Sequence, residues 1–448
     1  MTHSTYLNEE SQDDLLSRGF ARRDLARIAA VFGVGAVAAS IGRPAWASGG
    51  VPDPAPTAKV RIGANECWTG PLAPGALAAT NMVSQGNRYS PQDQRGDFIK
   101  AVMAVENVPY DHVAPWPGSS DPLCRSVVTF CSPTKGLVTA DPTFELAGRT
   151  AAWLGAPVKA VPLTADYTHD VKAMLAANPD AGLYYICTPN NPTGTITPLA
   201  DIEWLIANKP AGSMVLIDEA YTHFAGVPVA SYLAVKHDDV IVMRTFSKLF
   251  GMAGLRVGYI ITNPKNIAKM MRYDGGMQSG ALPVTSIACA TASLTAAPLI
   301  AARRAEMQTA RGLTLDHLKA KGIDVKPTNA NMFMIDWKTK KASEMQAAFR
   351  KESVEIGRSW PIWPTVSRVT VGSAAEMKAF LYGAGQDCGL RHFPTSPRLY
   401  AGVHRGPRLS MMEPDARWMP GQARHDGRGA TPARSTAGLR RAAASPFR

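Results

Sequence analysis

Residues 240–259 read VIVMRTFSKLFGMAGLRVGY. Their apolar, β-branched residues predict buried strands over Val240–Arg244 and Leu255–Ile261. The turn between these strands carries two hydroxyls and a lysine, at Thr245, Ser247 and Lys248, and Arg256 stands at the start of the second strand. A lysine can form an imine with an aldehyde cofactor, and hydroxyls beside an arginine suit a phosphate dianion. Alone, the segment also fits a basic turn beside a glycine-rich loop.

Two earlier segments also place polar residues directly after apolar strands. Met214–Ile217 leads into Asp218-Glu219-Ala220-Tyr221, and Gly182–Cys187 leads into TPNNPTG at 188–194. Ligands of parallel α/β sheets bind at the carboxyl ends of the strands. Asp218 could keep a pyridine nitrogen protonated, which makes the ring an electron sink, or it could simply cap the next turn. Asn191 could reach the cofactor's phenolic oxygen.

Strands and helices alternate along most of the chain. Strand patterns at 136–139 and 158–162 are interleaved with helical patterns at 93–107, 121–131, 144–154, 171–177 and 202–208. This alternation predicts an α/β fold with a mostly parallel sheet covered on both faces. Residues 325–337 and 342–381 read β-α-β-α and predict a smaller α+β unit.

The segments around Asn191, Asp218 and Lys248, in this order, resemble those of fold-type I pyridoxal-phosphate-dependent aminotransferases of class I/II, in the branch similar to histidinol-phosphate aminotransferase. The resemblance covers about residues 58–381 and implies pyridoxal 5'-phosphate as the cofactor. It also implies three parts: residues 48–84 joining the small domain, a large cofactor-binding domain over 85–295, and a small C-terminal domain over 296–384.

The resemblance assigns roles to single residues. Lys248 matches the Schiff-base lysine, which also shuttles the substrate proton, and Asp218 matches the partner of the pyridine nitrogen. Asn191 and Tyr221 match the groups that bind the phenolic oxygen, and Phe144 stands where a stacking tyrosine is usual. The phosphate contacts are implied for Ser119, Ser120, Asp121, Thr245, Ser247 and Arg256. Lys248, Asp218 and Tyr221 form the implied catalytic set.

Further matches concern the substrate and a second subunit. Arg368 matches the arginine that binds the substrate α-carboxylate, Arg358 resembles a second substrate arginine, and Asn65 lies in a segment resembling the N-terminal substrate segment. Tyr89 matches a tyrosine that reaches the phosphate in the neighbouring subunit, which implies a homodimer. Residues 67–69 are Cys-Trp-Thr where the family usually has Asn-Pro-Tyr, so a phosphate-bearing substrate is in doubt and Trp68 would suit an apolar or aromatic amino acid.

The implied function is an aminotransferase. It would move an amino group between an L-amino acid, or an amino-alcohol phosphate, and a 2-oxo acid through a Lys248 aldimine. The same scaffold permits amino-acid racemisation or decarboxylation, and a non-catalytic protein that binds pyridoxal phosphate or a metabolite is a further alternative. The donor, the acceptor and the pathway stay open. His223 is expected to be structural.

The first 47 residues resemble a twin-arginine export signal. Arg22 and Arg23 precede an apolar stretch over Ile28–Ile41, which is too short to span a bilayer. Ala45-Trp46-Ala47 then supplies the small residues of a cleavage site. We therefore expect a signal peptide over 1–47, transport by the twin-arginine machinery, and a periplasmic or secreted enzyme. An amphipathic helix with a chance arginine pair is the alternative.

The composition changes near residue 385. Residues 385–448 hold eleven arginines, no lysine and 15 glycines and prolines, which predicts a disordered tail, either natural or the product of an out-of-frame extension. This tail carries +7 of the chain's net charge of +12, so no nucleic-acid partner is expected for the fold itself. With 46% hydrophobic and 19% charged residues, the 448-residue chain is neither disordered throughout nor a coiled coil. Its six cysteines lack metal-ligand spacing, so we expect no metal site and no disulfide framework.

Overall fold

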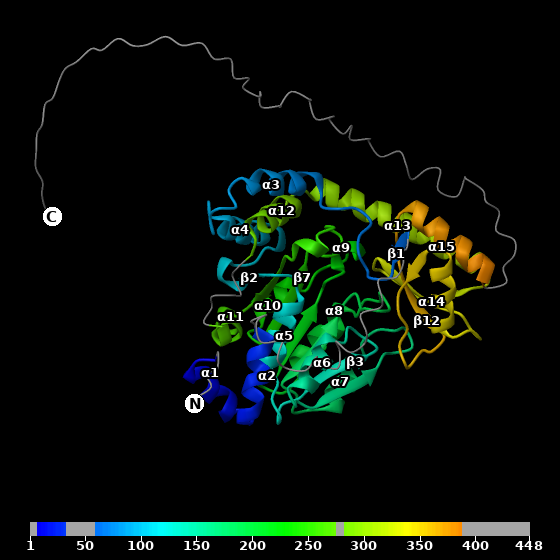
Figure 1. The fold of residues 1–448 in the computed structure, drawn as a ribbon. Coiled ribbons are helices and arrows are strands. Elements are labelled where there is room, and N and C mark those ends of the chain that lie inside the picture. Colours follow the sequence, from blue (N-terminus) through cyan, green and yellow to red (C-terminus); the bar gives the residue numbers. More distant parts are fainter. Residues whose placement is uncertain (1–6, 33–58, 275–281, 388–448) are drawn as a thin grey trace, which may run out of the picture. The chain divides into compact units, whose positions relative to one another are not determined.

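A seven-stranded sheet lies at the centre of the molecule (Figure 1). The computed structural model describes residues 7–32, 59–274 and 282–387. The strand order is β2-β8-β7-β6-β5-β3-β4. The bounds are β2 (Val113–Trp116), β3 (Leu137–Asp141), β4 (Val158–Pro162), β5 (Leu183–Cys187), β6 (Met214–Asp218), β7 (Val240–Thr245) and β8 (Gly258–Thr262). Strands β3 to β7 run parallel to one another, and β8 is antiparallel to both of its neighbours.

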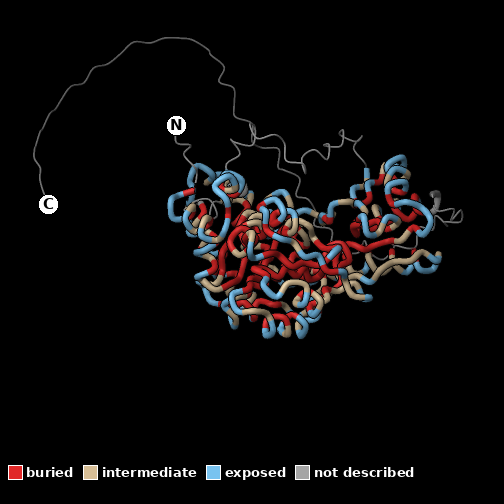
Figure 2. The backbone as a smooth tube through the Cα atoms, turned by 90° about the horizontal axis from the view of Figure 1, so that it is seen from below, coloured by how far each residue is buried: buried red, intermediate tan, exposed pale blue. Residues whose placement is uncertain are grey.

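Successive residues of the strands enter two separate hydrophobic cores, one on each face of the sheet. Tyr184 and Ile217 lie in one core, and Tyr185 and Leu216 lie in the other. Figure 2 shows that the buried backbone is concentrated in this central layer. Strands buried on both faces are the mark of a parallel sheet in an α/β protein, so the predicted fold class is confirmed.

Helices cover both faces. The core that holds Tyr184 also takes residues from α4 (Gln94–Glu106), α7 (Val171–Ala177), α8 (Leu199–Asn208), α10 (Ser231–Lys236) and α12 (Val284–Leu294). The core that holds Tyr185 takes residues from α5 (Ser120–Phe130), α6 (Leu146–Trp153) and α11 (Pro264–Met271). Shorter helical turns are η1 (Tyr110–His112), α9 (Thr222–Ala225), η2 (Ala253–Leu255) and η3 (Arg272–Asp274). Helix α3 (Ala73–Val83), which the sequence did not predict, packs on α12.

The C-terminal part forms a smaller α+β layer, as predicted. Strands β9 (Asp324–Val325), β10 (Met332–Asp336) and β12 (Val366–Thr370) make an antiparallel sheet, and β1 (Val60–Ile62) pairs in parallel with β11 (Val354–Ile356). The helices are α13 (Ala297–Ala320), α14 (Ala342–Lys351) and α15 (Ala374–Asp387). Phe349 of α14 stacks on Phe380 of α15 with ring centroids 5.3 Å apart. The β1–β11 pair brings the strand before Asn65 into this layer.

The predicted signal peptide over residues 1–47 contains two helices that pack against the sheet domain. Helices α1 (Glu9–Ser17) and α2 (Arg22–Phe32) pack on the same side of the sheet as α5 and α11. Leu15, Leu25 and Ile28 are at most 4% exposed. The physical reason is that an amphipathic helix beside an arginine pair can bury its apolar side on any suitable surface.

The other end also differs slightly. Helix α15 continues to Asp387, so residues 385–387 of the predicted tail are helical, and the rest of the tail lies outside the described residues. Among the described helices, none is by itself long and apolar enough to cross a bilayer. Helices α12 and α13 meet that test only as a pair, and they are bent by 83° against each other.

Candidate active site

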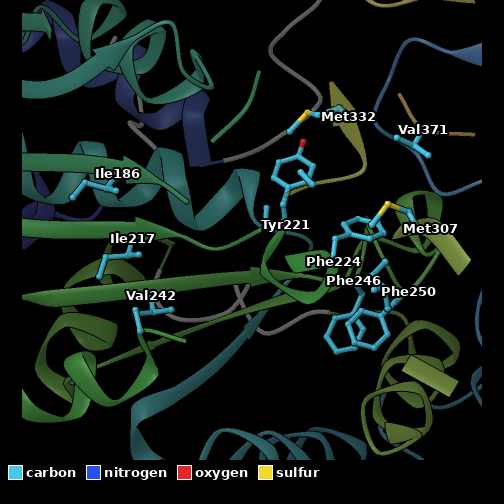
Figure 3. Packing of buried hydrophobic residues seen from close by; sticks show 14 of the residues in the cluster. Ile186, Ile217, Tyr221, Phe224, Val242, Phe246, Phe250, Met307, Met332 and Val371 are labelled. Carbon is cyan, nitrogen blue, oxygen red and sulfur yellow. The ribbon is translucent and has the colours of Figure 1, made fainter. Parts of the chain in front are cut away.

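The predicted site residues come together where β5, β6 and β7 end. Cys187 is the register partner of Asp218, and Asp218 is the partner of Met243, so the three loops that follow these strands leave one edge side by side. The backbone N–H of Thr188 donates to the carbonyl oxygen of Asp218 over 2.9 Å. In Figure 3, Ile186, Ile217 and Val242 mark the three strands, and Tyr221 follows the middle strand. The parallel alignment therefore assembles Asn191, Asp218 and Lys248 at one edge.

Lys248 reaches across to the N-terminal segment. Its Nζ donates to the carbonyl oxygen of Asn65 over 3.2 Å and lies 5.4 Å from the ring centroid of Tyr221. Burial, and next the positive charge of Arg368, lower the pKa of Lys248 to about 8. An amine with such a pKa is partly uncharged at neutral pH, which is the form that attacks an aldehyde.

Asp218 is a buried carboxylate with a donor on each oxygen. Its Oδ2 accepts from the Tyr185 hydroxyl over 2.9 Å, and its Oδ1 accepts from the backbone N–H of Ala220 over 3.1 Å. Burial raises the pKa of Asp218, and these hydrogen bonds and the Lys248 charge oppose the rise. A cationic ring nitrogen is a suitable partner for this buried carboxylate, because the positive charge would stabilise the ionised form that water no longer stabilises.

A cradle of donors lies beside the β7 edge. The Thr245 hydroxyl donates to Ser247 Oγ over 2.9 Å, and Arg256 Nη1 donates to the same oxygen over 3.2 Å. Gly118 has a φ of +85°, and a Cβ there would come within 2.3 Å of Arg256 Nη2, so the chain before α5 lies directly against the guanidinium. Ser119 is the N-cap of α5 and makes no side-chain cap hydrogen bond. Hydroxyls, a guanidinium and a helix N-terminus are the donors that a phosphate group takes.

The residues in this cradle match the predicted phosphate contacts. Ser119 is the N-cap of α5, Ser120 is its first residue, and Asp121 lies in its first turn. The Asp121 carboxylate accepts from Arg125 Nε over 3.0 Å. The donor set therefore fits the phosphate of pyridoxal phosphate.

Two predicted residues, Asn191 and Arg368, lie in contact. Arg368 Nη1 donates to Asn191 Oδ1 over 2.8 Å, and Nη2 donates to the carbonyl oxygen of Gly63 over 2.7 Å. With its oxygen occupied, the Asn191 amide keeps its NH₂ donors for another acceptor. The buried Arg368 Nε has no hydrogen-bond partner among the described residues, although a guanidinium nitrogen normally has one. A carboxylate is a suitable missing acceptor.

Tyr221 and Asn65 form a second contact pair. Asn65 Nδ2 donates to the Tyr221 hydroxyl oxygen over 3.0 Å, and its Oδ1 accepts from Thr370 Oγ1 over 3.1 Å. In Figure 3 the Tyr221 hydroxyl points toward Met332. Burial raises the pKa of Tyr221, so this hydroxyl stays protonated and can donate. Asn65 thus joins the β6 edge to β12.

Three predicted residues lie at the periphery. Arg358 is 44% exposed at its side chain and forms an ion pair with Glu145. Phe144 is half-buried in the loop before α6. Tyr89 is fully exposed and reaches none of these side chains within its own chain.

His223 lies edge-on against Phe250, with ring centroids 4.9 Å apart.

Tyr185 and Thr370 touch site residues but were not predicted. The signal for Tyr185 is its place on β5, two residues before Cys187, which faces Asp218 in register. Because side chains alternate along a strand, a tyrosine there lies on the same face as Asp218. Thr370 comes two residues after Arg368 on β12 and so shares its face. The described residues contain no cluster of three or more His, Cys, Asp or Glu able to hold a metal.

Comparisons with known proteins agree with this geometry. The model of the family "Aminotransferase class I and II" matches residues 57–382. An aromatic amino acid aminotransferase from Rhodococcus jostii is 32% identical over 326 residues, which are 72% of this chain and 88% of that protein. A histidinol-phosphate aminotransferase from Symbiobacterium thermophilum is 29% identical over 72% of this chain and 88% of its own length.

Solved structures share the fold. One from Erwinia carotovora atroseptica, provisionally named histidinol-phosphate aminotransferase, has a TM-score of 0.68 and 26% identity, over 74% of this chain and 96% of that one. The histidinol-phosphate aminotransferase of Sinorhizobium meliloti, solved with pyridoxal-5'-phosphate, has a TM-score of 0.68 and 22% identity, over 75% of this chain and 92% of that one. The chain therefore belongs to the class I and II aminotransferases, enzymes that use pyridoxal phosphate to transfer amino groups.

Proposed function

We propose that this enzyme transaminates aromatic L-amino acids with a 2-oxo acid, on pyridoxal phosphate held at the carboxyl edge of the central sheet. The observation that carries the proposal is the meeting of three unlike groups at that edge. These are the buried carboxylate of Asp218, the amine of Lys248 with its lowered pKa, and the guanidinium cradle around Arg256. Together they offer a partner for each polar end of this cofactor.

Particular residues would hold the cofactor. Asp218 would pair with its ring nitrogen, Asn191 and Tyr221 would donate to its phenolic oxygen, and Phe144 would cover a ring face. The phosphate would be bound by Ser119, Ser120, Asp121 through its backbone, Thr245, Ser247 and Arg256. When bound, pyridoxal phosphate supplies an electron sink for the pair left at the substrate Cα.

Lys248 would act as the acid and base. Its Nζ would take the proton from the substrate Cα and would donate a proton again later in the amino-group transfer. A pKa of about 8 suits both tasks, because the amine can gain and lose a proton near neutral pH. The Tyr221 ring beside Nζ and the Asn65 carbonyl limit where the amine can point.

Arg368 would bind the substrate α-carboxylate. It is 8% exposed, and its Nε has no hydrogen-bond partner among the described residues. An arginine presents paired N–H donors that match both oxygens of a carboxylate. Arg358, held at the rim by Glu145, would be a second substrate contact only after that ion pair opens.

The aromatic substrate is supported by Trp68 and by the relatives' names. Trp68, Ile62 and Val371 supply the apolar part of a pocket of about 160 Å³, which Arg61, Glu66 and Glu376 also line. A Cβ on Gly251 would come within 2.4 Å of the Thr69 carbonyl oxygen, so the Trp68 segment presses on the Lys248 loop. Thr69 stands where the family usually has a tyrosine near the substrate phosphate, and Trp68 directly precedes it, which favours an apolar side chain over a phosphate. Trp68→Ala should therefore raise KM for phenylalanine or tyrosine more than for alanine.

Absorbance and 2-oxo acid consumption test the reaction. Wild type with pyridoxal phosphate should show visible absorbance and consume a 2-oxo acid only when an amino acid is present. Lys248→Ala should lose both, whereas Lys265→Ala, at an exposed lysine, should keep both. Racemisation or decarboxylation would leave the 2-oxo acid unused, and a binding protein would not exchange the Cα hydrogen in deuterium oxide. Retained turnover in Lys248→Ala would contradict the assignment.

We also propose that the enzyme is exported through the twin-arginine route as a folded protein. The support is the order of Arg22-Arg23, the apolar stretch to Ile41 and Ala45-Trp46-Ala47. Exported protein should begin at Ser48, and lysines at positions 22 and 23 should retain it in the cytoplasm. An exported protein that still begins at Met1 would contradict the cleavage site.

A further inference from the structure

We propose that Tyr185 is a positioning residue for Asp218. The Tyr185 hydroxyl fixes the orientation of the Asp218 carboxylate, which faces the cofactor nitrogen, and keeps this carboxylate negatively charged. The proposal rests on the proposed function of Asp218. The carrying contact is the hydrogen bond of 2.9 Å from the Tyr185 hydroxyl to Asp218 Oδ2. Both side chains come from adjacent strands and are nearly or fully buried, with 0% exposure for Tyr185 and 3% for Asp218.

The strand register explains why these two side chains meet. Strands β5 and β6 are parallel, with Tyr185 opposite Leu216 and Cys187 opposite Asp218. Tyr185 and Leu216 belong to one core, so Asp218, two residues after Leu216, points to the same face. The phenol then spans the two-residue offset along the strand. The geometry of the sheet, and no flexible loop, sets this contact.

Burial makes the hydrogen bond important. A buried carboxylate with no donors takes up a proton and becomes neutral, and a neutral acid is a poor partner for a protonated ring nitrogen. Burial raises the pKa of Tyr185 well above its usual value, so this hydroxyl keeps its proton and donates to Asp218. The positive charge of Lys248 and the backbone N–H of Ala220 also favour the ionised carboxylate. Burial raises the pKa of the nearby Cys187 thiol and Tyr221 hydroxyl, so both of these groups are uncharged.

The neighbouring residue offers a matched control. Tyr184 lies on the same strand and is equally buried, but it enters the opposite core. Its hydroxyl donates to the carbonyl oxygen of Asn178 over 2.8 Å, away from Asp218. Tyr184→Phe and Tyr185→Phe therefore each remove one hydroxyl from one buried strand. Only the second removes a donor from the carboxylate.

The cofactor-free protein gives the first readout. The pKa of Asp218 is higher in the folded chain than in the unfolded chain, so its ionisation costs stability increasingly as the pH rises. Tyr185→Phe raises this pKa further. Its melting temperature should therefore fall below wild type by more at about pH 8 than at about pH 5. Tyr184→Phe should show a deficit that does not change with pH, and the same flat deficit in Tyr185→Phe would overturn the proposal.

Cofactor retention gives the second readout. Tyr185→Phe should hold pyridoxal phosphate about tenfold or more weakly than Tyr184→Phe, as expected for a lost hydrogen bond to a charged group. The pH dependence of the visible absorbance should shift as well. In an Asp218→Asn background, Tyr185→Phe should add no such loss, because the charge that it supports is gone. An equal further loss in that background would show that Tyr185 acts elsewhere.

Tyr185→His covers the case in which Tyr185→Phe does not fold. A neutral imidazole still has an N–H donor, so cofactor retention within about threefold of wild type is expected. A loss as large as that of Asp218→Asn would overturn the proposal. If wild type and Tyr184→Phe both fail to bind pyridoxal phosphate, the proposed function fails instead. The melting temperatures of the cofactor-free proteins still test Tyr185 in that case.

Discussion

The absence of a Cβ at Gly118 lets the chain lie directly against Arg256 in the proposed phosphate site. Its φ of +85° and its contact with Arg256 Nη2 both exclude a larger residue. Gly155 has a φ of +80°, but a Cβ placed there would meet no atom within 4 Å. An alanine at position 155 would therefore have the same backbone strain as one at position 118, but no close contact with another side chain. We expect Gly118→Ala and Gly155→Ala each to lose about 1 kcal/mol of stability. Only Gly118→Ala should also weaken pyridoxal phosphate binding, by about tenfold or more, because it displaces a guanidinium that binds phosphate.

Fluorescence titration with pyridoxal phosphate checks this prediction, and thermal melting checks the shared strain. Equal affinities in the two variants would mean that Arg256 does not hold the phosphate. A loss of affinity in Gly155→Ala as well would point to a general effect of strain.

Lys248 should react as an unusually acidic lysine. A pKa of about 8 leaves about one amine in eleven uncharged at pH 7, compared with about one in three thousand for an ordinary lysine. The rate at which the cofactor-free enzyme captures pyridoxal phosphate should therefore rise with pH and level off above pH 8. Arg368→Met removes a positive charge that favours the neutral amine, so it should shift this rise to higher pH. A wild-type rate that still climbs above pH 10 would contradict the lowered pKa.

The structure brings together those predicted residues whose position is fixed by a strand end. Asn191, Asp218 and Lys248 each follow a buried apolar strand, and parallel pairing brings such ends together. The partners Tyr185 and Thr370 were missed because they depend on register between strands, which a single sequence does not specify. The ion pair of Arg358 with Glu145 was missed for a similar reason, since 213 residues separate the two.

At the scale of elements, Arg18 forms hydrogen bonds that connect the α1–α2 segment to the sheet domain. Its Nη2 donates to the carbonyl oxygens of Val128 and Cys131 over 2.7 Å each, and its Nη1 donates to the Tyr273 hydroxyl over 2.8 Å. Arg18→Ala should therefore lower the free energy of unfolding of the full chain by about 2–3 kcal/mol. Arg22→Ala, at an exposed position on α2, should cost less than about 0.5 kcal/mol.

Denaturant unfolding of the uncleaved chain measures both variants. The same contacts predict that removal of residues 1–47 destabilises the fold, because the apolar surface under Leu15 and Ile28 becomes exposed. If Arg18→Ala and Arg22→Ala unfold at the same denaturant concentration, the hydrogen bonds of Arg18 do not contribute to the stability of the folded chain.

The elements show why the N-terminal packing escaped prediction. A helix with buried Leu25 and Ile28 and exposed arginines has the same composition as an export signal. Periodicity identifies the helix, but it does not show which surface the apolar side meets. Strand β2 was missed because it is short and contains Pro115. Its antiparallel pairing with β8 then completes the sheet.

At the scale of the whole molecule, one segment presents apolar side chains that the described part of the chain leaves exposed. Leu77 and Val83 of α3 are 62% and 67% exposed, and the fully exposed Tyr89 follows them along the chain. Exposed apolar side chains that gather in one segment are typical of a protein interface. We propose that this segment meets a second copy, with Tyr89 entering the partner's site. A twofold interface would then complete both sites at once.

Hybrid dimers can decide whether Tyr89 acts in its own subunit or in its partner. Dimers of Lys248→Ala alone should be inactive, and dimers of Tyr89→Ala alone should bind the cofactor weakly. A hybrid with one chain of each kind has one site that combines Lys248 of the second chain with Tyr89 of the first. This site contains both Lys248 and Tyr89. Hybrids that are isolated through a different tag on each chain should therefore recover about half of the wild-type activity per dimer. If Tyr89 served its own subunit, every site in the hybrid would carry one defect, and the hybrid would be no more active than the Tyr89→Ala dimer. Tyr110→Ala in place of Tyr89→Ala, at another exposed tyrosine, should bind the cofactor as wild type does.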